Sequence, residues 1–319
     1  MPQTLFDQQI TNRLSGAPIR RILAPVWLGA EQPGVELGPA ELSRGLAALD
    51  FTTRRLASPV AIADYAPADA HDRLHRGDLS FLAEVIAANE AIETAVHASI
   101  AAGELAVVLG GDHSIAFGSL AGAANACGRL GVLWFDAHLD LNTPETSPSG
   151  HLHGMPLAAA LGFGPPSLTG IGGTGAGAGT SAGAKLRPSD LAVLGIRDVD
   201  AGELRLVDHE SIWTRTTAAW RAEGIVAALD LALARLTSED IDAVHVSFDL
   251  DVLDPGALPG TGTPVPGGLS IEEARLMFGR LRRWDGPIRS LDVVELNPAL
   301  DPSGASARLA VSLLADLLV

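Results

Sequence analysis

The sequence is poor in cysteine, in basic residues and in long apolar runs, and each shortage excludes a class of protein. Of its 319 residues one is a cysteine, Cys127, so no disulfide can form within the chain, as is typical of proteins in a reducing compartment. The 22 Lys and Arg are outnumbered by 38 Asp and Glu, for a net charge of −16. This acidic balance argues against binding to nucleic acid or to an anionic membrane surface.

The chain also lacks the marks of a membrane or exported protein. No apolar run approaches the roughly 20 residues that span a bilayer. The first residues have no basic start followed by an apolar core, so we expect no signal peptide. We therefore expect a soluble, cytoplasmic protein. Its 47% hydrophobic content is enough for a large core, and its length suits a single domain over residues 1–319.

Short β-branched runs alternate with longer amphipathic stretches along the chain. The predicted strands are residues 20–26, 105–109, 131–136, 190–195, 243–249 and 289–295. The predicted helices are residues 39–49, 81–102, 218–236 and 271–281. Ser270 and Glu273 form a capping box before the last helix. Nearly continuous apolar strands separated by helices predict an α/β fold, a three-layer sandwich with a mostly parallel central sheet and helices on both faces.

One stretch, residues 169–183, consists mostly of Gly, Ala, Ser and Thr. Gly170, Gly172 and Gly175 match the dinucleotide-binding pattern formally. However, no strand precedes the match and no helix is predicted to follow it. We interpret this stretch as a mobile surface loop.

Six side chains with oxygen or nitrogen donors follow three of the predicted strands. They are His113, Asp136, His138, Asp140, Asp249 and Asp251. A spacing of two residues in extended chain places side chains on one face, and the carboxyl ends of parallel strands meet at one edge of a sheet. Four carboxylates and two imidazoles carry too much negative charge for a core without cations. Ligands of this kind favour manganese or magnesium over zinc, and bridging carboxylates suit two ions. By contrast, His245 lies within a strand, so we expect a core histidine or one that contacts a ligand.

The segments that carry these residues resemble those of the ureohydrolases, the arginase and agmatinase family. The matching segments are Gly-Gly-Asp-His-Ser at 110–114, Asp-Ala-His-Leu-Asp at 136–140 and Ser-Phe-Asp-Leu-Asp-Val-Leu-Asp-Pro at 247–255, with further matches at 34–39, 260–269 and 291–298. The resemblance implies an arginase-like fold, two Mn²⁺ per subunit, and hydrolysis of a guanidino compound to urea and an amine. It also implies a homo-oligomer, either a trimer or a hexamer.

The resemblance further implies a role for each matching residue. One ion would be held by His113, Asp136, Asp140 and Asp249, and the other by Asp136, His138, Asp249 and Asp251. A hydroxide that bridges the ions would attack the guanidinium carbon. His153 would carry a proton to the leaving amine and Glu295 would hold the guanidinium, and together with Asp140 they form the expected catalytic set.

The segment 142–156 is more similar to arginases than to agmatinases, which implies L-arginine as substrate and L-ornithine and urea as products. The residues expected to bind substrate are Asn142, Ser147 and Ser149 at the α-carboxylate, Asp200 at the α-amino group, Glu295 at the guanidinium, and His151. His151 stands where arginases typically carry Asn, which leaves the substrate open. The alternatives are an agmatinase, a guanidino-acid hydrolase, a formiminoglutamase, and a catalytically silent relative that binds metal.

Overall fold

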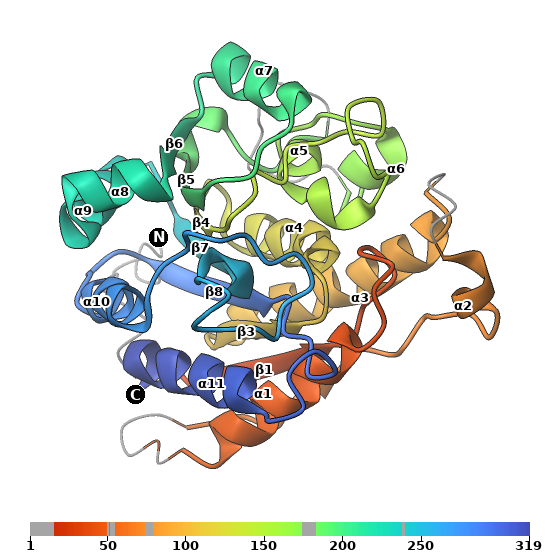
Figure 1. Cartoon of the computed structure of the whole chain (residues 1–319), viewed down its shortest axis with the longest axis horizontal. Coiled ribbons are helices and arrows are strands. Elements are labelled where there is room, and N and C mark those ends of the chain that lie inside the picture. The colour runs from red at the N-terminus through yellow and green to blue at the C-terminus, as the bar shows by residue number, and fades with distance from the viewer. Residues whose placement is uncertain (1–15, 50, 52–54, 75–78, 174–182, 238–239) are drawn as a thin grey trace, which may run out of the picture.

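Eight strands form one parallel sheet in the order β2-β1-β3-β8-β7-β4-β5-β6 (Figure 1). The computed structural model describes residues 16–49, 51, 55–74, 79–173, 183–237 and 240–319. The strands are β1 (Ile19–Ala24), β2 (Val60–Ala61), β3 (Leu105–Gly110), β4 (Leu130–Phe135), β5 (Leu191–Ile196), β6 (Trp213–Thr216), β7 (Ala243–Asp249) and β8 (Ile288–Val294).

Helices cover both faces of this sheet. They are α1 (Gly38–Ala47), α2 (Ala70–Arg73), α3 (Leu82–Ala101), α4 (Ala116–Cys127), α5 (Pro156–Ala160), α6 (Pro166–Thr169), α7 (Ala201–Glu210), α8 (Thr217–Glu223), α9 (Ile225–Arg235), α10 (Ile271–Arg282) and α11 (Ala305–Leu318). Short 3-10 turns follow several strands, including η2 (His113–Ile115), η3 (Leu152–Gly154) and η5 (Leu250–Val252).

Two hydrophobic clusters, one on each face, divide the molecule into three layers. Helices α3 and α4 pack on one face, where Val108 and Trp134 point. Helices α1 and α8 to α11 pack on the other face, where Val107 and Phe135 point. Because side chains alternate along a strand, successive residues of β3 serve the two clusters in turn. This architecture confirms the predicted three-layer α/β sandwich.

The predicted elements mostly match the structure, with errors at the sheet edges and in the helices. All six predicted strands are present. The two edge strands β2 and β6 were not predicted, and neither were the helices α2, α4, α5, α6, α7 and α11. The single helix predicted over 218–236 is wrong: Gly224, with φ 93°, separates α8 from α9. The capping box of Ser270 and Glu273 is confirmed at the start of α10.

Two further predictions concern the Gly-rich stretch and membrane-spanning segments. The Gly-rich loop predicted over 169–183 falls largely on residues 174–182, which lie outside the described residues. In the part of the chain that the structure describes, no helix is long and apolar enough to cross a membrane.

Candidate metal centre and active site

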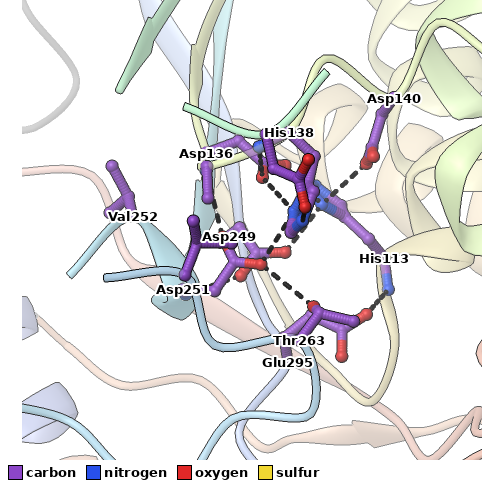
Figure 2. A network of polar contacts seen from close by, with 12 residues as sticks. His113, Asp136, His138, Asp140, Asp249, Asp251, Val252, Thr263 and Glu295 are labelled. Atoms are coloured by element: carbon purple, nitrogen blue, oxygen red, sulfur yellow. Dashed lines mark hydrogen bonds and ion pairs between the residues drawn. The ribbon is translucent and has the colours of Figure 1, made fainter. Parts of the chain in front are cut away.

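The six predicted donor side chains lie together at the carboxyl ends of β3, β4 and β7 (Figure 2). In an open parallel sheet this edge is where ligands bind, because the loops that follow the strands meet there. The structure thus brings together every side chain that the sequence assigned to a metal site.

His113 forms the centre of a first cluster. Its Nδ1 atom lies 3.1 Å from Asp136 Oδ2, 3.0 Å from Asp140 Oδ2 and 3.0 Å from Asp249 Oδ2. The imidazole stacks on the Trp134 ring, with centroids 4.2 Å apart and planes 5° from parallel. This packing holds the ring so that Nδ1 faces the three carboxylates.

His138 forms the centre of a second cluster, which shares Asp136 with the first. Its Nδ1 atom lies 3.0 Å from Asp251 Oδ2 and 3.4 Å from Asp136 Oδ1. Asp136 therefore presents one carboxylate oxygen to each imidazole. Thr263 donates a 3.1 Å hydrogen bond to Asp251 Oδ2, and the backbone N–H of Ala137 donates to Asp251 Oδ1 across 3.0 Å.

The backbone around the clusters is closely packed at one glycine and strained at two other residues. A Cβ atom at Gly111 would lie 1.8 Å from the Val26 carbonyl oxygen, so this close approach of two loops requires glycine. Asp140 has φ 52° and Glu295 has φ 64°, the left-handed region that costs an L-residue about 1 kcal/mol or more. Such strain at two residues of one site is typical of a functional constraint.

The clusters attract positive charge. Burial and the Asp136 carboxylate raise the pKa of Asp140 to about 6. Burial lowers the pKa of the His113 imidazole, but the carboxylates of Asp140 and Asp136 outweigh burial and raise it well above the usual value. The Asp251 and Asp136 carboxylates likewise raise the pKa of His138 far above its usual value, against the effect of burial. Protons or metal ions would therefore both stabilise the site.

The donor set fits metal ions better than protons alone. His113 Nδ1 and Asp140 Oδ2 are buried, and neither has a hydrogen-bond partner among the described residues. Buried polar atoms are normally satisfied, so an orphaned imidazole nitrogen beside an orphaned carboxylate oxygen indicates an ion between them. Two groups of three donors, His113 with Asp136 and Asp140, and Asp136 with His138 and Asp251, each have ligand atoms within 4.8 Å of one another.

His153 and Glu295 form an ion pair beside the clusters. His153 Nδ1 lies 3.0 Å from Glu295 Oε1, which also accepts a 2.9 Å hydrogen bond from the backbone N–H of His113. Burial opposes the charge on His153, but Glu295 raises the pKa of the imidazole to about 9. The pKa of Glu295 is lowered in return, because His153 outweighs the effect of burial there. The pair therefore holds a proton on the imidazole.

A cavity of about 160 Å³ opens above the metal ligands. It is lined by His113, His138, Asp140, Asn142, Ser147, Ser149, His153, Gly154, Asp198, Val199, Asp200, Glu203, Asp249 and Thr263. Four of the six residues predicted to bind substrate line this cavity: Asn142, Ser147, Ser149 and Asp200. The other two do not line it. Glu295 is buried behind His153, and the ring centroid of His151 lies 5.9 Å from that of His153.

The outer wall of the cavity is organised by Glu203, to which the sequence analysis gave no role. Its Oε1 atom accepts a 3.0 Å hydrogen bond from the backbone N–H of Leu141, and its Oε2 atom accepts one of 2.9 Å from that of Asp200. Asp200 Oδ2 in turn accepts a 2.8 Å hydrogen bond from Asn142 Nδ2. The capping-box spacing of Asp200 and Glu203 was the available signal for this arrangement.

The sequence profile of the Arginase family matches residues 16–319 of this chain. The chain belongs to the arginase family. An arginase from Bacillus caldovelox is 41% identical over 303 residues, which cover 94% of this chain and 97% of that one.

Solved structures of arginases have the same fold. A structure of arginase from Bacillus caldovelox has a TM-score of 0.83 and 39% identity, and covers 95% of this chain and 98% of that chain. A structure of Entamoeba histolytica arginase in complex with L-ornithine has a TM-score of 0.82 and 30% identity, and covers 96% of this chain and 99% of that chain. The predicted family and fold are confirmed.

Proposed function

We propose that this protein hydrolyses the guanidinium group of L-arginine, giving L-ornithine and urea, with two Mn²⁺ per subunit. The main support is the pair of clusters that share Asp136. These clusters lie under a cavity, and the outer wall of the cavity carries amide, hydroxyl and carboxylate groups. The similarity to bacterial arginases supports the choice of substrate.

Each ion would be held by four side chains. His113, Asp136, Asp140 and Asp249 would hold one, and Asp136, His138, Asp249 and Asp251 the other, so that Asp136 and Asp249 bridge. Oxygen-rich sets with two imidazoles and no thiolate favour manganese or magnesium over zinc, and the family resemblance implies manganese. Two divalent ions, when bound, lower the pKa of water and supply a nucleophile at neutral pH.

The cavity wall would bind the amino-acid end of the substrate. Asn142, Ser147 and Ser149 would donate hydrogen bonds to the α-carboxylate, and Asp200 would accept them from the α-ammonium group. Asn142 Nδ2 already donates to Asp200 Oδ2 across 2.8 Å, so the two groups are held side by side for a zwitterionic ligand.

The inner end of the cavity would bind the guanidinium group and protonate the leaving amine. Glu295, which lies 3.0 Å from His153 just behind the cavity wall, would hold the guanidinium, since a carboxylate pairs well with a planar cation. His153, which keeps a proton beside Glu295, would deliver that proton to the leaving amine. His151, whose ring centroid lies 5.9 Å from that of His153, would also bind the substrate. Asp140 would orient the attacking group as well as bind metal.

The active form would be a cytoplasmic homo-oligomer, a trimer or a hexamer. The single cysteine supports the cytoplasmic location, and the family resemblance supports the homo-oligomer. Light scattering of the purified protein in solution would measure its mass, and a monomer at the concentrations used for activity would contradict it.

The test of the proposed reaction is product analysis. Protein stripped of metal by a chelator should be inactive, and added Mn²⁺ should restore release of L-ornithine and urea from L-arginine in equal amounts. Urea from agmatine or a guanidino acid, with none from L-arginine, would indicate another guanidino hydrolase. No urea from any of these compounds would indicate either a formiminoglutamase, which would release formamide from formiminoglutamate, or the catalytically silent relative.

A further inference from the structure

A row of buried polar side chains crosses the core behind the metal ligand His113. His113 Nε2 lies 2.8 Å from Ser247 Oγ, which donates a 2.6 Å hydrogen bond to Asp292 Oδ1. Asp292 Oδ2 lies 3.0 Å from His245 Nε2. Each of these four residues is at most 1% exposed. The polar row starts at the metal centre and does not reach solvent through its own members.

The row follows from the pairing of two parallel strands. Ser247 of β7 lies opposite Asp292 of β8, and His245 lies opposite Ser290 one step along the same face. The next residue of β7 on that face is the metal ligand Asp249. Ser119 of α4 closes the row with a 2.6 Å hydrogen bond to Asp292 Oδ2.

The directions of these hydrogen bonds are fixed by chemistry. Asp292 accepts from Ser247, Ser119 and His245, which requires an ionised carboxylate. Burial opposes that charge, but His245 and other partners outweigh burial and lower the pKa of Asp292. The single hydroxyl hydrogen of Ser247 goes to Asp292, so Ser247 can only accept from His113. His113 must therefore carry a hydrogen on Nε2, so that in the neutral imidazole Nδ1 is the nitrogen available to a metal ion.

Stability alone does not explain why this row is polar. Buried ionic and polar groups are commonly replaced by apolar side chains of similar size without loss of stability. The stacking of Trp134 on His113 sets the plane of the imidazole but not which nitrogen carries the hydrogen. Ser247 contacts His113 Nε2, and this contact determines which nitrogen carries the hydrogen.

The second imidazole of the metal centre is held differently. His138 Nε2 lies 3.9 Å from Asp198 Oδ2, beyond hydrogen-bond distance, and the Asp198 side chain is 68% exposed. The polar row therefore supports one cluster, the one centred on His113.

We propose that Asp292 is a positioning residue that acts through Ser247 to hold His113 in the tautomer with a free Nδ1, and so sets the metal affinity of the His113 cluster separately from that of the His138 cluster. This inference rests on the proposed metal centre. Residues that orient a metal ligand typically change metal affinity by about 10- to 100-fold when they are replaced.

The test is a titration of chelator-stripped protein with Mn²⁺. Calorimetry and the electron paramagnetic resonance of free Mn²⁺ measure the binding. The parent protein should bind two ions. Ser247→Ala and Asp292→Asn should weaken one site by about 10- to 100-fold and leave the other near the parent value. Ser290→Ala is the matched control, because it removes a buried hydroxyl beside His245 without interrupting the path from His113 to Asp292. It should keep both affinities.

A second readout reports the tautomer itself. In Mg²⁺-loaded protein with ¹⁵N-labelled histidine, NMR correlations should place the His113 hydrogen on Nε2 in the parent, and Ser247→Ala should broaden or shift this signal. Circular dichroism shows whether each variant folds. If one of them does not, the Mn²⁺ affinities of the other still test the proposal.

Unchanged affinities in the folded variants, or equal weakening of both sites, would overturn the role of Asp292 and leave the metal centre intact. A parent protein that binds no Mn²⁺ would overturn the metal centre and this inference together.

Discussion

Arg197 donates a 2.5 Å hydrogen bond from Nη2 to the main-chain carbonyl oxygen of Asp251. The same guanidinium also donates to the carbonyl oxygens of Gly195, Leu253 and Val265. It thereby ties the end of β5 to the turn that follows β7 and carries the ligand Asp251. A planar fork with five N–H donors can satisfy these carbonyls at once, whereas an ammonium group cannot.

Arg197→Lys should therefore destabilise the protein. We expect the free energy of unfolding to fall by about 1.5–3 kcal/mol, because buried carbonyl oxygens lose charged donors. Urea denaturation measures this. Arg215→Lys is the control, since Arg215 forms a partly exposed ion pair with Glu223 on the edge of the sheet, and its loss should change stability little. Equal effects of the two substitutions would show that the Arg197 fork has no special role.

Asp136→Ala should abolish turnover, because Asp136 presents an oxygen to both imidazoles. We expect activity to fall by more than about 100-fold, together with loss of bound Mn²⁺. The metal content of the purified protein and urea release measure the two effects. Asp230→Ala, on the outer helix α9, should change neither. Full activity of Asp136→Ala with its full complement of Mn²⁺ would refute the ligand assignment.

His151→Asn should change KM for L-arginine more than kcat. The residue lies beside His153 but outside the cavity wall, so it can affect substrate binding without being part of the proton path. Steady-state kinetics with L-arginine separates the two constants. If KM is the same as that of the parent, His151 does not belong to the substrate site.

Asp190→Asn should lower the free energy of unfolding at neutral pH but not in acid. The buried Asp190 carboxylate accepts hydrogen bonds of 2.7 and 2.8 Å from Arg129, which outweigh burial and lower its pKa. A lowered pKa in the folded state means that the carboxylate stabilises the fold above its unfolded pKa of about 3.9 and that this contribution is lost as pH falls through the folded pKa.

We therefore expect Asp190→Asn to lower the free energy of unfolding by about 1–3 kcal/mol at pH 7, and the difference from the parent to shrink below pH 4 or so. Urea denaturation at a series of pH values tests this. Asp240 contacts the same arginine but is 78% exposed, so Asp240→Asn should have little effect at any pH. A pH-independent difference for Asp190→Asn would contradict the sign of the shift.

The metal centre could be predicted from sequence because its parts are local. His113, Asp136 and Asp249 each stand at the end of an apolar strand, and a parallel sheet brings such ends to one edge. Part of the outer wall of the cavity, including Asn142 and Asp200, was also predicted. Glu203 was missed because its role depends on bonds to Leu141, in a loop 62 positions earlier in the chain.

The polar row behind His113 could not be predicted. Ser247 and Asp292 lie 45 positions apart, and only the register of β7 on β8 makes them neighbours. Helix α4 was missed for a different reason. Nearly all of its residues are buried, so it lacks the alternation of apolar and polar faces that reveals a surface helix. The edge strand β6 was missed because it is half-exposed and only four residues long.

The most direct test of the account is the ratio of kcat/KM for L-arginine to that for agmatine, measured with the Mn²⁺-loaded protein and with Ser149→Ala. Agmatine lacks the α-carboxylate that Asn142, Ser147 and Ser149 would bind, and a charged hydrogen bond contributes about 1.5–3 kcal/mol, or roughly 10- to 100-fold. The parent should clearly prefer L-arginine, and Ser149→Ala should lose efficiency on L-arginine but not on agmatine. Preference of the parent for agmatine would contradict the proposed substrate.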